Sequence, residues 1–147
     1  MFTSGLLLLI FNIFEVVSAS GRSCDPSSGT YPNPGRVLDP LVEKILLNVK
    51  GNPEYDCEYE KAIDLKLTLD DDGEMMREDY PHVTGKELDF KVTKNGDTEK
   101  TLPETLVDEV LQNWSGQLPN VANKFGCNID RDEDPKTTTF KISCIFS

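Results

Sequence analysis

The hydrophobic residues between Leu38 and Val49 recur every three or four positions, which predicts a helix. Asp39 can cap the beginning of this helix, and Gly51-Asn52-Pro53 ends it. A second helical pattern runs from Glu54 to Leu69, although the leucines of its second half also alternate as they would in a strand. We favour a helix there, because the segment continues a helical pattern up to the Asp70-Asp71-Asp72-Gly73 run.

The clearest helical pattern of the chain lies between Leu102 and Trp114. The residues from Thr101 to Glu104 match a capping box at its beginning, and a glycine and a proline close it. Before this helix, the hydrophobic residues of the segment 88–92 alternate with polar ones, which predicts a half-buried strand. Asn95-Gly96, directly after that segment, is typical of a turn.

The last part of the chain carries two alternating runs, residues 125–129 and 140–146. We expect these runs to pair as a hairpin around a polar loop from Asp130 to Thr137. Helices therefore come first and a hairpin last, an order that is typical of the α+β class rather than the α/β class.

The first residues have the features of a secretory signal. Residues 6–14 form an apolar run that is too short to span a bilayer, which takes about 20 residues, and Val17-Ser18-Ala19 fits a cleavage site. We therefore predict a signal peptide over residues 1–19, with a buried N-terminal helix as the alternative. Residues 20–36 are rich in Ser, Gly and Pro and predict an irregular arm. The folded domain is then residues 37–147, which contain no second long apolar stretch.

Four cysteines, all after the predicted signal peptide, agree with export. An even number in an oxidising compartment indicates two disulfides, and four cysteines allow three pairings. Cys127 and Cys144 fall on the inward faces of the predicted hairpin strands, which favours a bridge between them. Cys24–Cys57 then follows by elimination. A bound transition metal is disfavoured, because the sequence has no CxxC pair and one histidine.

The charge of the chain disfavours two classes of partner. Acidic residues number 26 and basic residues 15, which gives a formal net charge of −11. The lysines and arginines are spread along the sequence, whereas nucleic acids and anionic membranes require concentrated positive charge. We therefore expect no nucleic-acid partner and no membrane partner, and nothing in the sequence calls for a cofactor.

Asn113-Trp114-Ser115 is the one N-glycosylation sequon of the sequence, and we predict a glycan on Asn113. Trp114 shares a helix face with the hydrophobic residues before it, so we expect it to be buried. Asn113 lies about 100° around the same helix, toward its polar face, and we expect it to be exposed.

His82 is the single histidine of the chain. A catalytic histidine needs a nucleophile or a carboxylate within hydrogen-bond reach. Glu78 and Asp79 precede it, but no obvious serine nucleophile does. We interpret His82 as a surface residue and predict no catalytic residues. The enzyme alternative is a secreted hydrolase that uses acidic residues and His82.

Two acidic clusters are the other candidates for chemistry. Asn128, Asp130, Asp132 and Asp134 alternate as at the start of a calcium loop, but Glu133 stands where such loops have glycine. We expect a solvated acidic loop there, and a weak calcium site at Asp130, Asp132 and Asp134 is the alternative. The other cluster surrounds Gly73 and consists of Asp70, Asp71, Asp72 and Glu74.

Three motifs together resemble the secreted CAP proteins, especially the activation-associated secreted proteins of parasitic nematodes. Residues 55–62 (YDCEYEKA) are similar to the YDCxLExxA stretch of that family, residues 123–127 (NKFGC) to its TKxGC segment, and residues 142–146 (ISCIF) to its VVCxY strand. The resemblance covers roughly residues 37–69 and 113–147. It implies an α-β-α arrangement and a bridge between the cysteines of the last two motifs.

The chain departs from the family at the two histidines of the central cleft. Leu47 occupies the position of the first histidine, and the gapless count back from Cys127 places Asn113 at the second. The middle section is also shorter than in the family. The chain therefore resembles a shortened relative without the cleft, of the kind called ASP-related proteins in hookworms.

The resemblance implies a secreted protein without enzymatic activity. We expect it to be released by a parasitic nematode and to bind a host or parasite protein. A carrier of lipids or small ligands is a further alternative, which requires an apolar pocket of about 300 Å³ or more.

Overall fold

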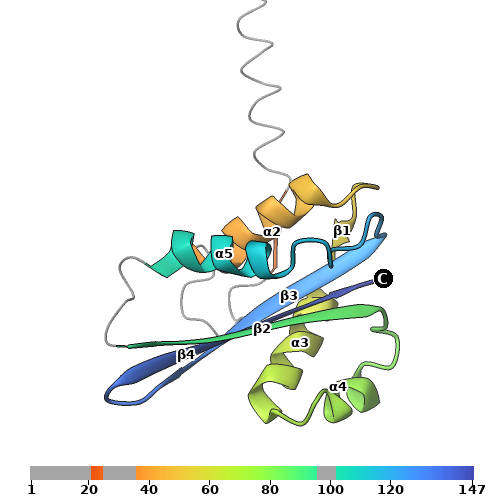
Figure 1. The fold of residues 1–147 in the computed structure, drawn as a ribbon. Helices are drawn as coiled ribbons and strands as arrows, with labels where there is room; N and C mark the ends of the chain where they lie inside the picture. Colours follow the sequence, from red (N-terminus) through yellow and green to blue (C-terminus); the bar gives the residue numbers. More distant parts are fainter. Residues whose placement is uncertain (1–20, 25–35, 96–101) are drawn as a thin grey trace, which may run out of the picture.

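The computed structural model describes residues 21–24, 36–95 and 102–147. A four-stranded sheet lies between two layers of helices (Figure 1). α2 and α5 cover one face of the sheet, and α3 and α4 cover part of the other. This arrangement confirms the predicted α+β class and the degenerate α-β-α architecture. The elements are α2 (Leu38–Asn48), β1 (Glu54–Tyr55), α3 (Cys57–Leu69), α4 (Glu74–Asp79), β2 (Lys86–Asn95), α5 (Leu102–Asn113), β3 (Lys124–Glu133) and β4 (Thr137–Phe146).

The strands follow the order β1-β3-β4-β2, with β2 and β3 antiparallel to β4 and the short β1 parallel to β3. The predicted hairpin is confirmed, but the predicted loop over residues 130–137 is wrong, because β3 continues to Glu133. Asp134 makes the shorter loop possible. Its carboxylate accepts hydrogen bonds at 2.8 Å from both the backbone N–H and the hydroxyl of Thr137.

Two helix beginnings differ from the expectation. Asp39 does not cap α2, because the helix starts one residue earlier and Asp39 lies in its first turn, 3.2 Å from Arg22. Glu54 and Tyr55 form β1 instead of extending α3. α3 begins after Asp56, whose side chain accepts a hydrogen bond from the backbone of Glu58 and caps the helix.

Each face of the sheet has its own hydrophobic core. The larger core lies under α2 and α5 and contains Trp114, Phe125 and Phe140, all at most 1% exposed. The smaller core lies under α3 and α4 and includes Tyr59, Ile63 and Ile145. Alternate residues of β4 therefore point to different cores, as strand geometry requires.

Gly126 sets the distance between α3 and β3. A Cβ atom at this position would lie 2.4 Å from the Cβ atom of Tyr59 and 2.7 Å from the backbone nitrogen of Glu60. The absence of a side chain therefore lets the backbone of α3 approach the sheet closely.

Both disulfides join the predicted partners. Cys127 and Cys144 are directly opposite each other on β3 and β4, with their Cα atoms 4.1 Å apart. Cys24 and Cys57 join the N-terminal arm to the first turn of α3, with their Cα atoms 5.5 Å apart. The described residues contain no free cysteine.

Several expectations fall on residues that the structure does not describe. They are the signal peptide (residues 1–19), most of the arm (residues 20–36), Gly96 of the predicted turn and Thr101 of the predicted capping box. None of the helices within the described ranges combines the length and the apolar character that crossing a membrane requires.

Candidate functional site

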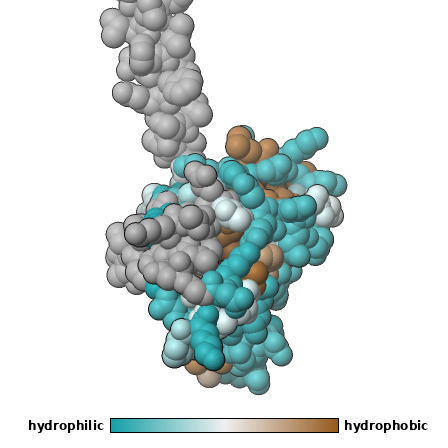
Figure 2. All heavy atoms as spheres, turned by 60° about the vertical axis from the view of Figure 1, so that its left-hand side comes forward, coloured by the Kyte–Doolittle hydropathy of each residue, from teal (hydrophilic) through white to brown (hydrophobic). Residues whose placement is uncertain are grey.

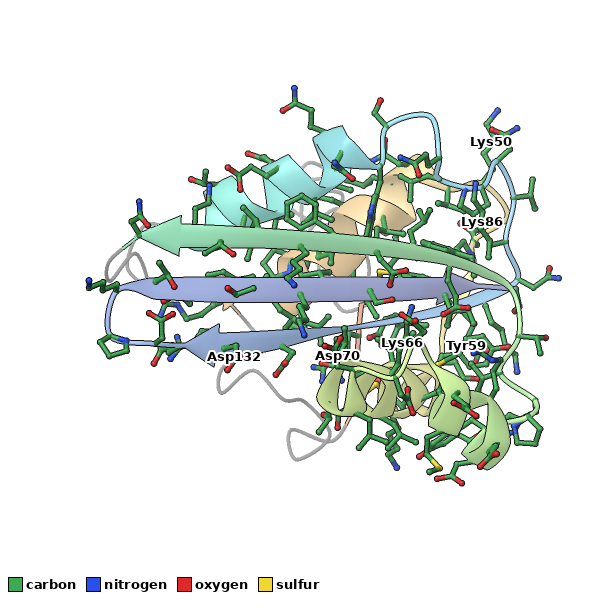
Figure 3. The ribbon with its side chains drawn as sticks, turned by 60° about the horizontal axis from the view of Figure 1, so that its bottom comes forward. Lys50, Tyr59, Lys66, Asp70, Lys86 and Asp132 are labelled. Carbon is green, nitrogen blue, oxygen red and sulfur yellow. A yellow bond between two sulfur atoms is a disulfide. The ribbon has the colours of Figure 1, made fainter. Side chains whose placement is uncertain are left out.

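A pocket of about 340 Å³ lies where the last turn of α3 meets the sheet. Figure 3 shows Lys66 and Asp70 at this end of α3, beside the strands. Charged side chains of both signs line much of the pocket. They are Lys66, Asp70, Asp72, Asp89, Lys91 and Lys141.

Lys66 is the most tightly held cation of this pocket. Its Nζ atom lies 2.8 Å from Glu87 Oε1, 2.7 Å from Asp89 Oδ1 and 3.3 Å from Ser143 Oγ. Burial disfavours its charge, but the hydrogen bonds to Asp89 and Glu87 outweigh that cost and raise the pKa of Lys66. Lys66 is therefore an ammonium ion at neutral pH.

The contact between Lys66 and Ser143 does not form a serine–lysine catalytic pair. The hydroxyl of Ser143 donates its proton to Asp89 Oδ1 at 2.6 Å, and the side chain is fully buried. A general base must be unprotonated to accept the proton of the serine, whereas Lys66 is kept charged. The cluster therefore ties α3 to β2 by ion pairs and to β4 by the hydrogen bond to Ser143.

The pocket is large enough for the carrier alternative, but charged side chains lie among its hydrophobic lining residues Leu67, Phe90 and Ile142. Six charged residues line it, and two of them form an ion pair, with Lys141 Nζ 3.3 Å from Asp70 Oδ1. Lys91 is directly opposite Lys141 in the register of β2 and β4. An apolar ligand would have to desolvate these charges, which is costly.

His82 lies on the surface, as expected. Its Nε2 atom is 2.7 Å from Glu58 Oε2, and the two side chains are 55% and 62% exposed. The hydrolase alternative requires a concave site with two or more carboxylates. In the described part of the chain, the hydrogen-bond partner of His82 is a single carboxylate.

The acidic cluster at Gly73 has a local structural role. Asp70, in the left-handed conformation, ends α3. Asp71 accepts hydrogen bonds from the backbone N–H groups of Gly73 and Met75, at 3.0 and 3.1 Å, and so fixes the beginning of α4.

The alternating acids of β3 do not form the expected acidic loop. Asp130 and Asp132 lie on a regular strand, opposite Lys141 and Thr139 of β4. Asn128 is buried and donates a hydrogen bond to the backbone carbonyl of Glu60. Among the described residues, no three side chains of His, Cys, Asp or Glu are placed to hold a metal together.

The resemblance assigns Leu47 and Asn113 to the two positions of the cleft histidines. Leu47 is 85% exposed near the end of α2, and Asn113 is the exposed last residue of α5. Trp114 is buried as predicted, at 1% exposure, and its Nε1–H donates to the backbone carbonyl of Asp89 at 3.1 Å. Neither position therefore supplies an imidazole.

The sequence did not reveal a buried ion pair beneath the first disulfide. The carboxylate of Glu60 is fully buried and binds the guanidinium of Arg22. The hydroxyl of Tyr55 lies 2.8 Å from Glu60 Oε1, and burial together with this carboxylate raises the pKa of Tyr55. The two cysteines were the available clue, because Arg22 lies two residues before Cys24 and Glu60 one turn after Cys57.

The fold and these sites define a small disulfide-linked α+β protein in three layers, with structural ion pairs at its charged clusters. A family model described as Ancylostoma-associated secreted protein related matches residues 24–146. The chain belongs to this family. Comparison with curated proteins and with solved structures gave no match. The family is one of secreted CAP-like proteins, and the two disulfides agree with an oxidising compartment.

Proposed function

We propose that the protein is a secreted, non-enzymatic member of its family that is released by a parasitic nematode and acts by binding a host or parasite protein. The observation that carries this proposal is Leu47, a large aliphatic side chain that is 85% exposed. The resemblance assigns it to one of the two cleft positions. An imidazole there would support chemistry, whereas a leucine supplies apolar surface that becomes a candidate contact area where it adjoins other exposed hydrophobic residues.

A second exposed hydrophobic residue lies at the same end of the molecule. Val121 is 64% exposed, and its backbone pairs with Lys50, three residues after Leu47. Figure 2 shows hydrophobic spheres that stand out at the top of the molecule, at the height of α2 in Figure 1. This end therefore combines the exposed apolar side chains of Leu47 and Val121 with the exposed cation of Lys50.

The chemistry of the charged clusters weighs against catalysis. Lys66 is kept as an ammonium ion between two carboxylates, and Ser143 is buried and donates to one of them. His82 has a single exposed carboxylate as its partner. These groups are arranged to stabilise the fold and its surface.

The experiment is an affinity capture in which the mature protein and two variants are each used as bait. The proteins that bind to each bait are then compared. Leu47→Asp should remove the partner from the captured fraction. Leu69→Asp, at the end of α3 in the other helical layer, is the control, because Leu69 is also exposed, at 47%. Equal capture by the wild type and Leu47→Asp would refute the assignment of this surface. If the wild type had a hydrolase activity and His82→Gln lacked it, the secreted-hydrolase alternative would be favoured.

A further inference from the structure

β2 is an edge strand with a free side. It pairs with β4 along all ten of its residues, and no other strand of the described sheet pairs with it. The backbone groups on such an edge can pair with a strand of another molecule, and natural proteins cover or block edges of this kind.

α5 runs along β2 in the opposite direction and covers part of this edge. Lys94 Nζ lies 2.7 Å from Glu109 Oε1, and the backbone carbonyl of Asp89 accepts a hydrogen bond from the indole of Trp114. Further on, Lys86 Nζ donates to the backbone carbonyl of Gln117, after the helix has ended. Figure 1 shows α5 directly above β2.

Between these contacts, the described residues supply no strand or hydrogen-bond partner to the outer side of β2. The carbonyl of Asp89 points away from β4, because it accepts the hydrogen bond from Trp114. Backbone groups alternate between the two sides of a strand, so the N–H and C=O groups of Lys91 and Thr93 point outward as well. Lys91 and Thr93 lie between the contact to Trp114 and the contact to Glu109.

Asn113 lies on the flank of α5 that faces this opening. It follows Glu109 by four residues, so the two side chains share one flank of the helix, and Glu109 contacts β2. Asn113 is exposed, and its backbone carbonyl accepts a hydrogen bond from Gln117 Nε2 at 3.0 Å. The sequon thus begins on the last residue of the helix and continues into an exposed turn at Ser115.

We propose that Asn113 carries an N-linked glycan and that this glycan stands beside the free edge of β2, where it prevents a strand of a second molecule from pairing. The central residue of the sequon, Trp114, is buried and bonded to β2, so it fixes the attachment point against the edge. A bulky hydrophilic group at Asn113 extends the cover that α5 provides. The proposal rests on export, which is part of the proposed function.

The first part of the test is expression of the full chain in insect cells. We expect protein in the medium with a mass above that of the polypeptide, reduced by glycosidase. The excess mass should be absent in both Asn113→Gln and Ser115→Ala. Secreted protein without a glycan would refute the glycosylation of Asn113 but not export. Unglycosylated protein retained in the cells would refute export and the glycan together.

The second part of the test measures self-association by light scattering, with and without the glycan. Glycosylated protein should remain monomeric at concentrations at which glycosidase-treated protein and Asn113→Gln associate. Unchanged mass after removal of the glycan would refute the shielding role.

Two edge variants in the Asn113→Gln background connect the association to β2. Lys91→Pro removes an outward N–H group, and Thr93→Lys adds a charge to the edge; both are devices that block edge pairing. Return to the monomer in either variant supports the proposal. Association of both variants to the same extent as Asn113→Gln alone would show that β2 is not the surface involved.

Discussion

The buried carboxylate of Glu60 is held by the guanidinium of Arg22, which comes from the arm before the domain. Arg22 Nη2 lies 3.0 Å from Glu60 Oε2, and the two side chains are 4% and 0% exposed. The same guanidinium reaches Asp39 at 3.2 Å. One residue of the arm therefore joins α3 to the first turn of α2, beside the disulfide between Cys24 and Cys57.

Arg22→Ala should lower the free energy of unfolding by about 3–5 kcal/mol, because it leaves the carboxylate of Glu60 buried without its cation. Lys44→Ala is the matched control, since Lys44 pairs with Asp108 on the surface, where the side chains are 44% and 67% exposed. The control should cost at most about 1 kcal/mol. Urea denaturation of both variants measures the two values. If the two variants lost similar free energies of unfolding, the buried pair would contribute no more to stability than the surface pair.

Gly126→Ala should destabilise the protein by about 1–3 kcal/mol, the usual cost of forcing extra atoms into a packed interior. The new methyl group would lie 2.4 Å from the Cβ atom of Tyr59 and 2.7 Å from the backbone nitrogen of Glu60. α3 would have to move away from β3 to accommodate it. Gly21→Ala is the control, because among the described residues, its chain neighbours aside, no heavy atom lies within 4 Å of the corresponding position. If the two variants unfolded at the same temperature, the close approach of α3 to β3 at Gly126 would be contradicted.

The sequence predicted the elements whose pattern is local. The helical spacing identified α2 and α5, and the alternation of residues 140–146 identified the strand that pairs with both neighbours. Each of these patterns repeats over several residues. A whole face of the element therefore packs into the core, and this packing stabilises the element that the pattern predicts.

The features that the sequence did not predict depend on partners far along the chain. β1 has two residues, and Tyr55 becomes a strand residue only because Phe125 of β3 lies beside it. Glu60 reads as an ordinary polar helix residue until the disulfide brings Arg22 to it. Asp39 was expected to cap α2. It lies in the first turn of the helix instead, where it pairs with Arg22.

Zinc should not bind the mature protein at a stoichiometric site of submicromolar affinity. Leu47 and Asn113, at the positions that the resemblance assigns to the cleft histidines, supply no imidazole, and both cysteine pairs are bridged. Isothermal calorimetry of the mature protein with zinc chloride measures this directly. His82→Gln is the control for weak binding at the exposed pair with Glu58. A one-to-one isotherm for the wild type that persists in His82→Gln would contradict the prediction and restore a metal site to the molecule.

Lys66 should stabilise the protein up to the alkaline range. The hydrogen bonds to Asp89 and Glu87 raise its pKa despite its partial burial, so folding favours the ammonium form. A group with a raised pKa stabilises the folded state fully below its unfolded-state pKa, about 10.4 for lysine, and loses this effect as the pH rises through the folded-state value. The stability difference between the wild type and Lys66→Met should therefore be constant from about pH 7 to about pH 9 and shrink above about pH 10.4.

Urea denaturation at each pH measures this difference, with Lys61→Met as the control, because Lys61 is exposed on the same helix. The control should show a smaller difference than Lys66→Met, because an exposed lysine contributes little to stability. If the effect of Lys66→Met instead disappeared between about pH 7 and about pH 9, the amine would be losing its proton near neutrality. Lys66 would then be a possible base for Ser143, which lies 3.3 Å away, and the structural reading of the pocket would be wrong.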